Sequence, residues 1–75
     1  MVLFSEHARI EMDDEDIQEG DVTQATLKGT LVKRQTRGAR GTRYIMRGPT
    51  LGARMIEVVC RLVGENVRII TVYRV

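Results

Sequence analysis

Apolar residues recur with a helical spacing at the start of the chain. Three of them stand four positions apart and therefore share one face of a helix, namely Phe4, Ala8 and Met12. Ser5 is a favourable N-cap, and Glu6 places a carboxylate at the positive end of the helix dipole. The acidic run 13–16 is a poor helix interior, because aspartate side chains compete for backbone hydrogen bonds. The pattern predicts a first helix that begins after Ser5 and frays within residues 13–16.

A second helix is predicted from about residue 19 to residue 28. Ile17 precedes it as a core residue, and its inward positions hold Val22, Ala25 and Thr26. Gly29 follows the last helical residue, where we expect a left-handed conformation that glycine adopts at low cost.

From residue 30 onward, polar and apolar residues alternate with the period of a β-strand. Glycine-containing turns separate four predicted strands, which span residues 30–37, 42–47, 54–63 and 67–74. Positive φ angles are expected at the turn glycines, namely Gly38, Gly41, Gly48, Gly52 and Gly64. The sequence predicts a single α+β domain over residues 1–75, with two N-terminal helices packed on one face of a four-stranded antiparallel sheet.

The last hairpin sets which side chains share a sheet face. If Glu65 and Asn66 form its loop, Gly64 lies opposite Val67, and one face becomes apolar. We expect the helices to cover that face, which holds Ile56, Val58, Cys60, Leu62 and Ile69. The other face then mixes aliphatic and charged residues, namely Glu57, Val59, Arg61, Val63, Arg68, Ile70, Val72 and Arg74.

Charge is divided unevenly along the chain. Residues 1–21 hold eight acids against Arg9 alone, a net charge of −7, whereas residues 22–75 hold eleven basic residues against Glu57 and Glu65, a net charge of +9. No acid occurs between residues 22 and 56. Such a division suits an anionic partner, although it also serves pairing between the helices and the sheet rim.

Several classes of protein are not indicated. No apolar run approaches the roughly 20 residues of a membrane span, and the start of the chain turns polar at Ser5, unlike a signal peptide. Cys60 is the single cysteine and is expected to be a buried thiol in the reduced cytoplasm. One histidine and one distant cysteine lack metal-ligand spacing, and no phosphate-cradling glycine motif is present. We therefore expect no metal, no cofactor and no membrane association.

Short motifs at both ends resemble a prokaryotic family. The opening Phe4-Ser5-Glu6-His7-Ala8 and the closing stretch 68–73 (Arg-Ile-Ile-Thr-Val-Tyr), with Met12, Ile17, Val22 and Gly29 between them, are similar to domain of unknown function 4258 (DUF4258). In that family the first helix usually carries arginine where this chain has Glu11 and Glu15. The order of elements also resembles the RelE/ParE toxin superfamily, and that resemblance implies a ribonuclease neutralised by an antitoxin chain.

Candidate catalytic residues follow from the chemistry of metal-free RNA cleavage. That reaction needs a base for the 2′-hydroxyl, charge stabilisation at phosphorus and an acid for the leaving oxygen. In the register above, cations and a base share one face, namely Arg61, Arg68, Arg74 and Glu57. His7 is the only side chain that titrates ordinarily near neutrality and is a further proton carrier. The alternatives are a solvated face with a salt bridge, and a His7 that caps a turn or bonds a strand.

The densest basic cluster covers the first hairpin and its tip. It consists of Lys33, Arg34, Arg37, Arg40, Arg43 and Arg47, and it suits sequence-independent contact with nucleic-acid phosphates. Only Tyr44 stands nearby for base stacking, which disfavours an aromatic platform for single strands. The alternative is a solvated hairpin rich in arginine.

Two functions from different classes are consistent with these residues. The first is a RelE-like small toxin, or a toxin-derived protein, that acts on RNA or the ribosome as a metal-free ribonuclease and is neutralised by a partner chain. The second is a non-catalytic module whose basic hairpin binds nucleic acid or an acidic protein segment. The sequence does not indicate an oligomeric state.

Overall fold

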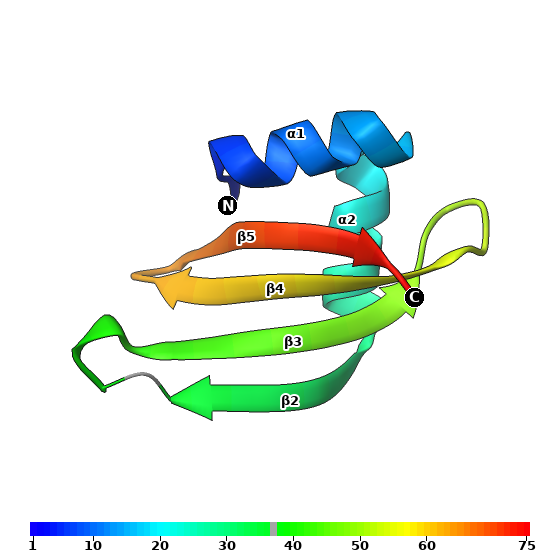
Figure 1. Ribbon diagram of the computed structural model, residues 1–75. Coiled ribbons are helices and arrows are strands. Elements are labelled where there is room, and N and C mark those ends of the chain that lie inside the picture. The colour runs from blue at the N-terminus through cyan, green and yellow to red at the C-terminus, as the bar shows by residue number, and fades with distance from the viewer. Residues whose placement is uncertain (37) are drawn as a thin grey trace.

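The computed structural model describes residues 1–36 and 38–75 and contains two helices and five strands (Figure 1). In chain order the elements are β1 (Val2–Phe4), α1 (Glu6–Glu15), α2 (Glu19–Lys28), β2 (Thr30–Thr36), the 3₁₀ turn η1 (Gly38–Arg40), β3 (Thr42–Pro49), β4 (Met55–Val63) and β5 (Asn66–Arg74). The strands form one sheet in the order β1-β5-β4-β3-β2. Neither helix in the described part of the chain is long and apolar enough to cross a membrane.

The sheet corrects the expected architecture. The α+β class is confirmed, but the sheet has five strands and is mixed, because β1 pairs in parallel with β5 while the other neighbours are antiparallel. The sequence placed Phe4 on the first helix, whereas it ends β1 opposite Ile69. Backbone bonds extend this pairing at both ends, from Val67 N to Met1 O and from Ser5 N to Ile69 O, each 3.0 Å long.

Ser5 begins α1 as predicted. Its hydroxyl accepts from Ala8 N at 3.0 Å and donates to Ile70 O at 2.9 Å, so the cap also joins the helix to β5. The acidic run does not fray, because α1 continues to Glu15 and ends at Asp16 in the left-handed region. Ile17 N then donates to Met12 O at 2.8 Å, and the Ile17 side chain anchors this end in the core.

Two glycines allow α2 to lie close to β3. Gly29 has a φ of −80°, so the predicted left-handed cap is wrong. A Cβ at Gly29 would lie 2.2 Å from Ala25 O, and one at Gly48 would lie 2.6 Å from the same atom. The backbones therefore approach where no side chain fits. Positive φ is confirmed at Gly38, Gly41 and Gly64, but not at Gly48 or Gly52.

The core lies on one face of the sheet. Figure 1 shows α2 behind the strands and α1 along the border beside β5. Both helices contribute to one buried cluster, made of Ala8, Met12, Ile17, Val22, Ala25, Ile56, Val58, Cys60, Ile69 and Val72. Neither α1 nor α2 covers the opposite face, which we call the open face (Figure 1).

The last hairpin has a different register from the predicted one. Its loop is Gly64-Glu65, so Leu62 lies opposite Val67 and Val63 opposite Asn66. The φ of +61° at Gly64 suits this two-residue turn. A bulge then leaves Ile70 without a register partner, so the strand alternation shifts by one residue within β5. As a result Val72 joins the core instead of the open face. The prediction that Leu62 is buried is also wrong, because Leu62 keeps to the core side of β4 but lies next to the last residue of the strand and is 60% exposed.

Candidate functional site

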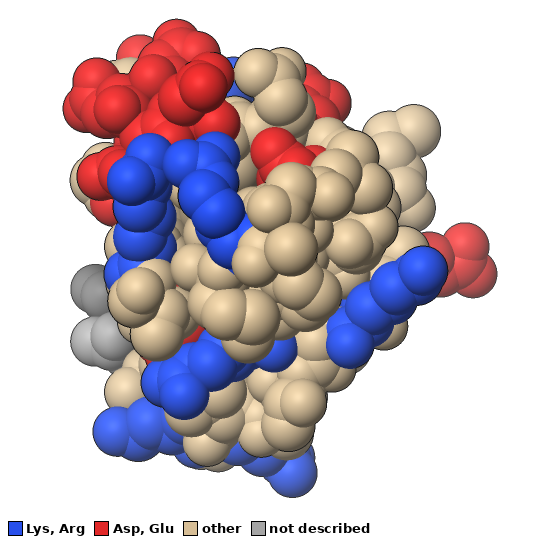
Figure 2. Space-filling model, turned by 90° about the vertical axis from the view of Figure 1, so that its right-hand side faces the viewer, with Lys and Arg blue, Asp and Glu red and all other residues tan. Residues whose placement is uncertain are grey.

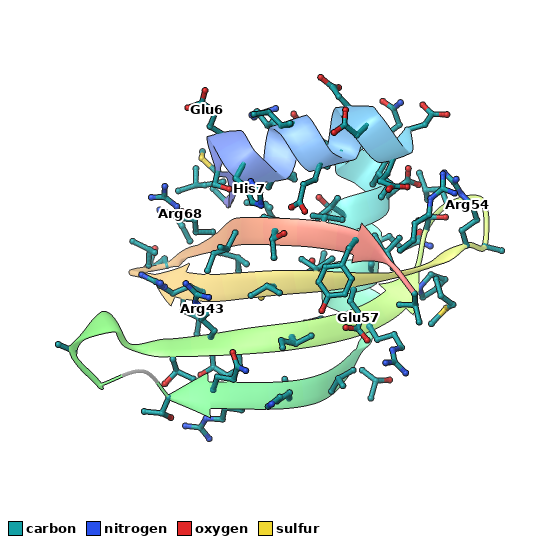
Figure 3. The ribbon with its side chains drawn as sticks, viewed as in Figure 1. Glu6, His7, Arg43, Arg54, Glu57 and Arg68 are labelled. Atoms are coloured by element: carbon teal, nitrogen blue, oxygen red, sulfur yellow. The ribbon has the colours of Figure 1, made fainter. Side chains whose placement is uncertain are left out.

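Three arginines lie directly opposite one another on the open face. Arg43 of β3 pairs in register with Arg61 of β4, which pairs in register with Arg68 of β5. Neighbouring strands are about 4.8 Å apart, so the three side chains start from adjacent backbone positions. Their sequence neighbours Tyr44, Cys60 and Ile69 belong to the core side, which places the arginines on the other face. Figure 3 shows Arg43 and Arg68 at the same end of the sheet. We call these three residues the arginine row.

Two members of the arginine row, Arg61 and Arg68, place positive charge side by side. Among the described residues, Arg61 and Arg68 make no ion pair. The Arg61 Nε is buried and has no hydrogen-bond partner among the residues that the structure describes. Like charges opposite each other on a sheet are destabilising, and buried donors nearly always have an acceptor.

A shallow hollow of about 600 Å³ adjoins the row. It is lined by Arg61 and Arg68, by the start of α1, and by further residues of β4 and β5. These other lining residues are Ser5, His7, Val63 and Ile70. The His7 side chain is 69% exposed, and its Nε2 lies 3.4 Å from Glu11 Oε1. The structure therefore brings three of the proposed catalytic residues together, namely His7, Arg61 and Arg68.

Glu57 belongs to a separate cluster. Its Oε2 accepts from Arg47 Nε at 2.8 Å and also from the second Arg47 nitrogen, and its Oε1 accepts from Tyr73 OH at 2.7 Å. These bonds from Tyr73 and Arg47 lower the pKa of Glu57, while the bond to Glu57 raises the pKa of Tyr73. A carboxylate held ionised by two donors is a weak base.

The distance along β4 also separates Glu57 from the arginine row. Glu57 and Arg61 share the open face but are four residues apart, which corresponds to roughly 13 Å along a strand. Between them lies an apolar row that includes Ile45 and the 7% exposed Val59. The structure does not bring Glu57 to the hollow (Figure 3).

Two acids of α1 hold the end of β5. Glu11 accepts from the Thr71 hydroxyl and, at 3.1 Å, from Val72 N. Glu15 Oε2 lies 2.8 Å from Arg74 Nε, and the Glu15 carbonyl accepts from Arg74 as well. Arg74 lies in register with Ile56 and is therefore away from the arginine row. The positions at which the family resemblance implies arginine thus join α1 to β5 in this chain.

The basic hairpin is spread over different surfaces. Lys33 pairs with Ile45 on the open face, Arg34 pairs with Tyr44 on the core side, and Arg47 is bonded to Glu57. Arg40 ends the 3₁₀ turn, and Arg37 lies outside the described residues. Arg43 is the member that joins the arginine row.

Sequence reasoning missed the link between Arg43 and the row, and it missed Tyr73 as a partner of Glu57. The first follows from the register of β3 with β4, and the second from the register of β4 with β5, for which the loop Gly64-Glu65 was the available signal. The division of charge was visible in the sequence. Figure 2 shows acidic side chains gathered at the top over α1 and basic side chains over the sheet below.

Other chemistry finds little support in the described residues. They contain no group of three His, Cys, Asp or Glu side chains that could hold a metal ion. Cys60 is buried, and burial raises the pKa of its thiol. A thiol of this kind is a poor nucleophile.

Comparison with known proteins identifies one family. The model of the family described as Domain of unknown function (DUF4258) matches residues 4–74. Neither a curated protein nor a solved structure matches the chain.

Proposed function

Since the chain belongs to the DUF4258 family, whose description names no activity, we propose from its own residues that it binds the phosphodiester backbone of RNA. The observation that carries this proposal is the arginine row on a face that no helix covers. Guanidinium groups match phosphate oxygens in geometry and charge. The buried Arg61 Nε would gain the acceptor that residues 1–36 and 38–75 do not supply.

The shape and composition of the open face favour single-stranded RNA over a duplex. The arginine row runs across three strands of an exposed sheet, and guanidinium planes can stack on unpaired bases. Tyr73 is held by Glu57, and Tyr44 belongs to the core side, so aromatic stacking contributes little. Binding of this kind depends on the backbone rather than on base sequence. We place this activity in the cytoplasm.

A salt titration tests the proposal. The full chain is titrated into a labelled oligouridine, and its affinity is followed by anisotropy between 50 and 200 mM salt. Three phosphate contacts to a single strand predict a slope of about −2 in log K against log salt. Arg61→Gln should reduce the slope by about 0.7, because one contact is lost. Lys28→Gln, a loss of charge in the last turn of α2, is the matched control. A slope near zero would reject the proposal.

The position of His7 favours a second candidate, a metal-free ribonuclease. His7 lines the same hollow as Arg61 and Arg68. The imidazole would accept the proton of a 2′-hydroxyl, and the 2′-oxygen would bond to phosphorus while the bond to the 5′-oxygen breaks. The arginines would stabilise the charge on the phosphorane, and the 5′-oxygen would take a proton from water. Such an activity would make the chain a toxin that a partner protein must inhibit.

Cleavage and binding can be separated by one substitution. A ribonuclease would convert oligouridine to products with a 2′,3′-cyclic phosphate, and His7→Gln would abolish those products while RNA affinity stays within twofold. Arg61→Gln would lower both. Growth and messenger-RNA decay after induced expression in a bacterial host give the cellular test. If expression is harmless and RNA binding is intact, the ribonuclease is rejected and RNA binding remains as the proposed function.

A further inference from the structure

We propose that the outer edge of β2 binds an acidic, extended segment of another protein, which adds to the sheet as a further strand. This inference is independent of RNA binding by the arginine row. It rests on the edge itself, on the side chains that flank it and on one irregularity in its pairing.

The edge is long and unpaired. β2 is the last strand of the sheet, and β3 is its one neighbour among the strands that the structure describes (Figure 1). It spans seven residues, Thr30–Thr36, whereas the strand at the other border, β1, spans three. Every second backbone amide and carbonyl of such a strand points outward, and a peptide in extended conformation can bond to them.

Two adjacent aliphatic side chains on β2 are accessible to solvent. Leu31 is 49% exposed and Val32 is 47% exposed. They stand next to each other in the strand and give apolar surface at the border of the sheet. An added strand would cover this surface and remove it from water.

The positive charge of β2 indicates the composition of the strand that would bind to it. Lys33 and Arg34 follow directly and are exposed, and neither makes an ion pair within residues 1–36 and 38–75. A second copy of this chain would bring the same cations against them, which is destabilising. A segment in which acidic and aliphatic residues alternate would pair with both the cations and the apolar side chains.

A bulge at Val32 provides a selective variant. Leu31 pairs with Met46 and Lys33 with Ile45, so Val32 has no register partner in β3. Proline is tolerated at bulges and on edge strands, where its missing N–H removes no bond of the existing ladder. Val32→Pro should therefore keep the fold and weaken only the outer edge.

The experiment follows backbone amides by NMR in the full chain. The probe is a synthetic eight-residue peptide of alternating valine and glutamate. We expect chemical-shift changes and slowed amide exchange confined to residues 30–36, with both effects lost in Val32→Pro. Arg34→Glu should lower the affinity for the peptide by roughly tenfold or more, because a repulsion between like charges replaces an attraction. Lys28→Glu, the same charge change outside the strand, should alter the affinity less than twofold.

Four outcomes would overturn the proposal. The first is equal binding of a peptide with lysine in place of glutamate, and the second is peptide-induced shifts that fall outside β2. The third is a response of the β2 amides to oligouridine but not to the peptide, which would assign the edge to RNA. The fourth is a dimer in sedimentation whose formation protects the same amides, which would assign it to a second copy.

Discussion

Arg61 lies directly opposite Arg68 across β4 and β5, and Arg43 lies opposite Arg61 on its other side. Three adjacent cations on one row of a sheet oppose folding in the absence of an anion, because like charges that face each other repel. The same row becomes favourable once a phosphate lies between the guanidiniums. The stability of the chain and its ligand affinity are therefore linked through these side chains.

The first prediction is that Arg61→Gln stabilises the free chain. Removing the central charge relieves two repulsive pairs, and the expected gain in the free energy of unfolding is about 0.2–1 kcal/mol at low salt. High salt screens the repulsion and should shrink the difference. Thermal melting at 20 and 500 mM salt measures both effects, with Lys28→Gln as the control. A loss of stability would mean that Arg61 serves the fold rather than a ligand.

The second prediction concerns the pH dependence of the Glu57 cluster. Tyr73 and Arg47 hold the pKa of Glu57 below its ordinary value. The carboxylate therefore stabilises the fold above about pH 4.3 and loses this contribution as the pH falls through its lower folded pKa. Glu57→Gln should be less stable than the native chain at pH 7, and the two should converge in acid.

Glu65→Gln is the matched control for this comparison. Glu65 lies exposed in the last hairpin loop and takes part in no ion pair of the described residues. Its substitution should leave the melting curves unchanged at every pH. A constant difference between Glu57→Gln and the native chain down to pH 2 would show that the ionised carboxylate is not what stabilises the cluster.

The third prediction tests the close approach of α2 and β3. A Cβ at Gly48 would lie 2.6 Å from Ala25 O and 2.9 Å from Gly29 Cα, both backbone atoms that cannot move independently. Gly48→Ala should cost about 1–3 kcal/mol of stability through overpacking. At Gly52 the nearest atom would be 3.9 Å away, so Gly52→Ala should be close to neutral. Equal melting temperatures for the two variants would contradict this packing.

Local signals in the sequence were sufficient for the helices. The cap at Ser5 and the spacing of Ala8 and Met12 act within one or two turns, and α1 begins where they indicate. β1 could not be found in this way, because its three residues gain their bonds from β5, more than sixty positions away. An edge strand of this kind has no local signature apart from a short apolar run.

The candidate site depended on a choice that the sequence left open. Gly64-Glu65 and Glu65-Asn66 are both acceptable two-residue loops, and the bulge at Ile70 has no signal of its own. The composition therefore predicted a basic sheet face and a set of candidates that included Arg61, Arg68 and His7. It could not separate Arg74 from them or add Arg43, because those two assignments follow from the register. Glu57 could have been separated from Arg61, because the two residues are four positions apart on one strand, which corresponds to roughly 13 Å.

The last prediction separates the two registers by stability. Leu62 cannot do so, because it shares a face of β4 with Val58 and Cys60 in both registers. The expected register placed Val72 on the open face, whereas in the structure it is 1% exposed and belongs to the core. Val72→Ala should therefore cost roughly 1.5–3 kcal/mol, whereas Leu62→Ala, at a side chain that is 60% exposed, should cost about 0.5 kcal/mol or less. Denaturant unfolding of both variants measures the difference. A negligible loss at Val72 would favour the Glu65-Asn66 loop, in which Arg68 lies opposite Val63 instead of Arg61, and would remove the row on which RNA binding is proposed.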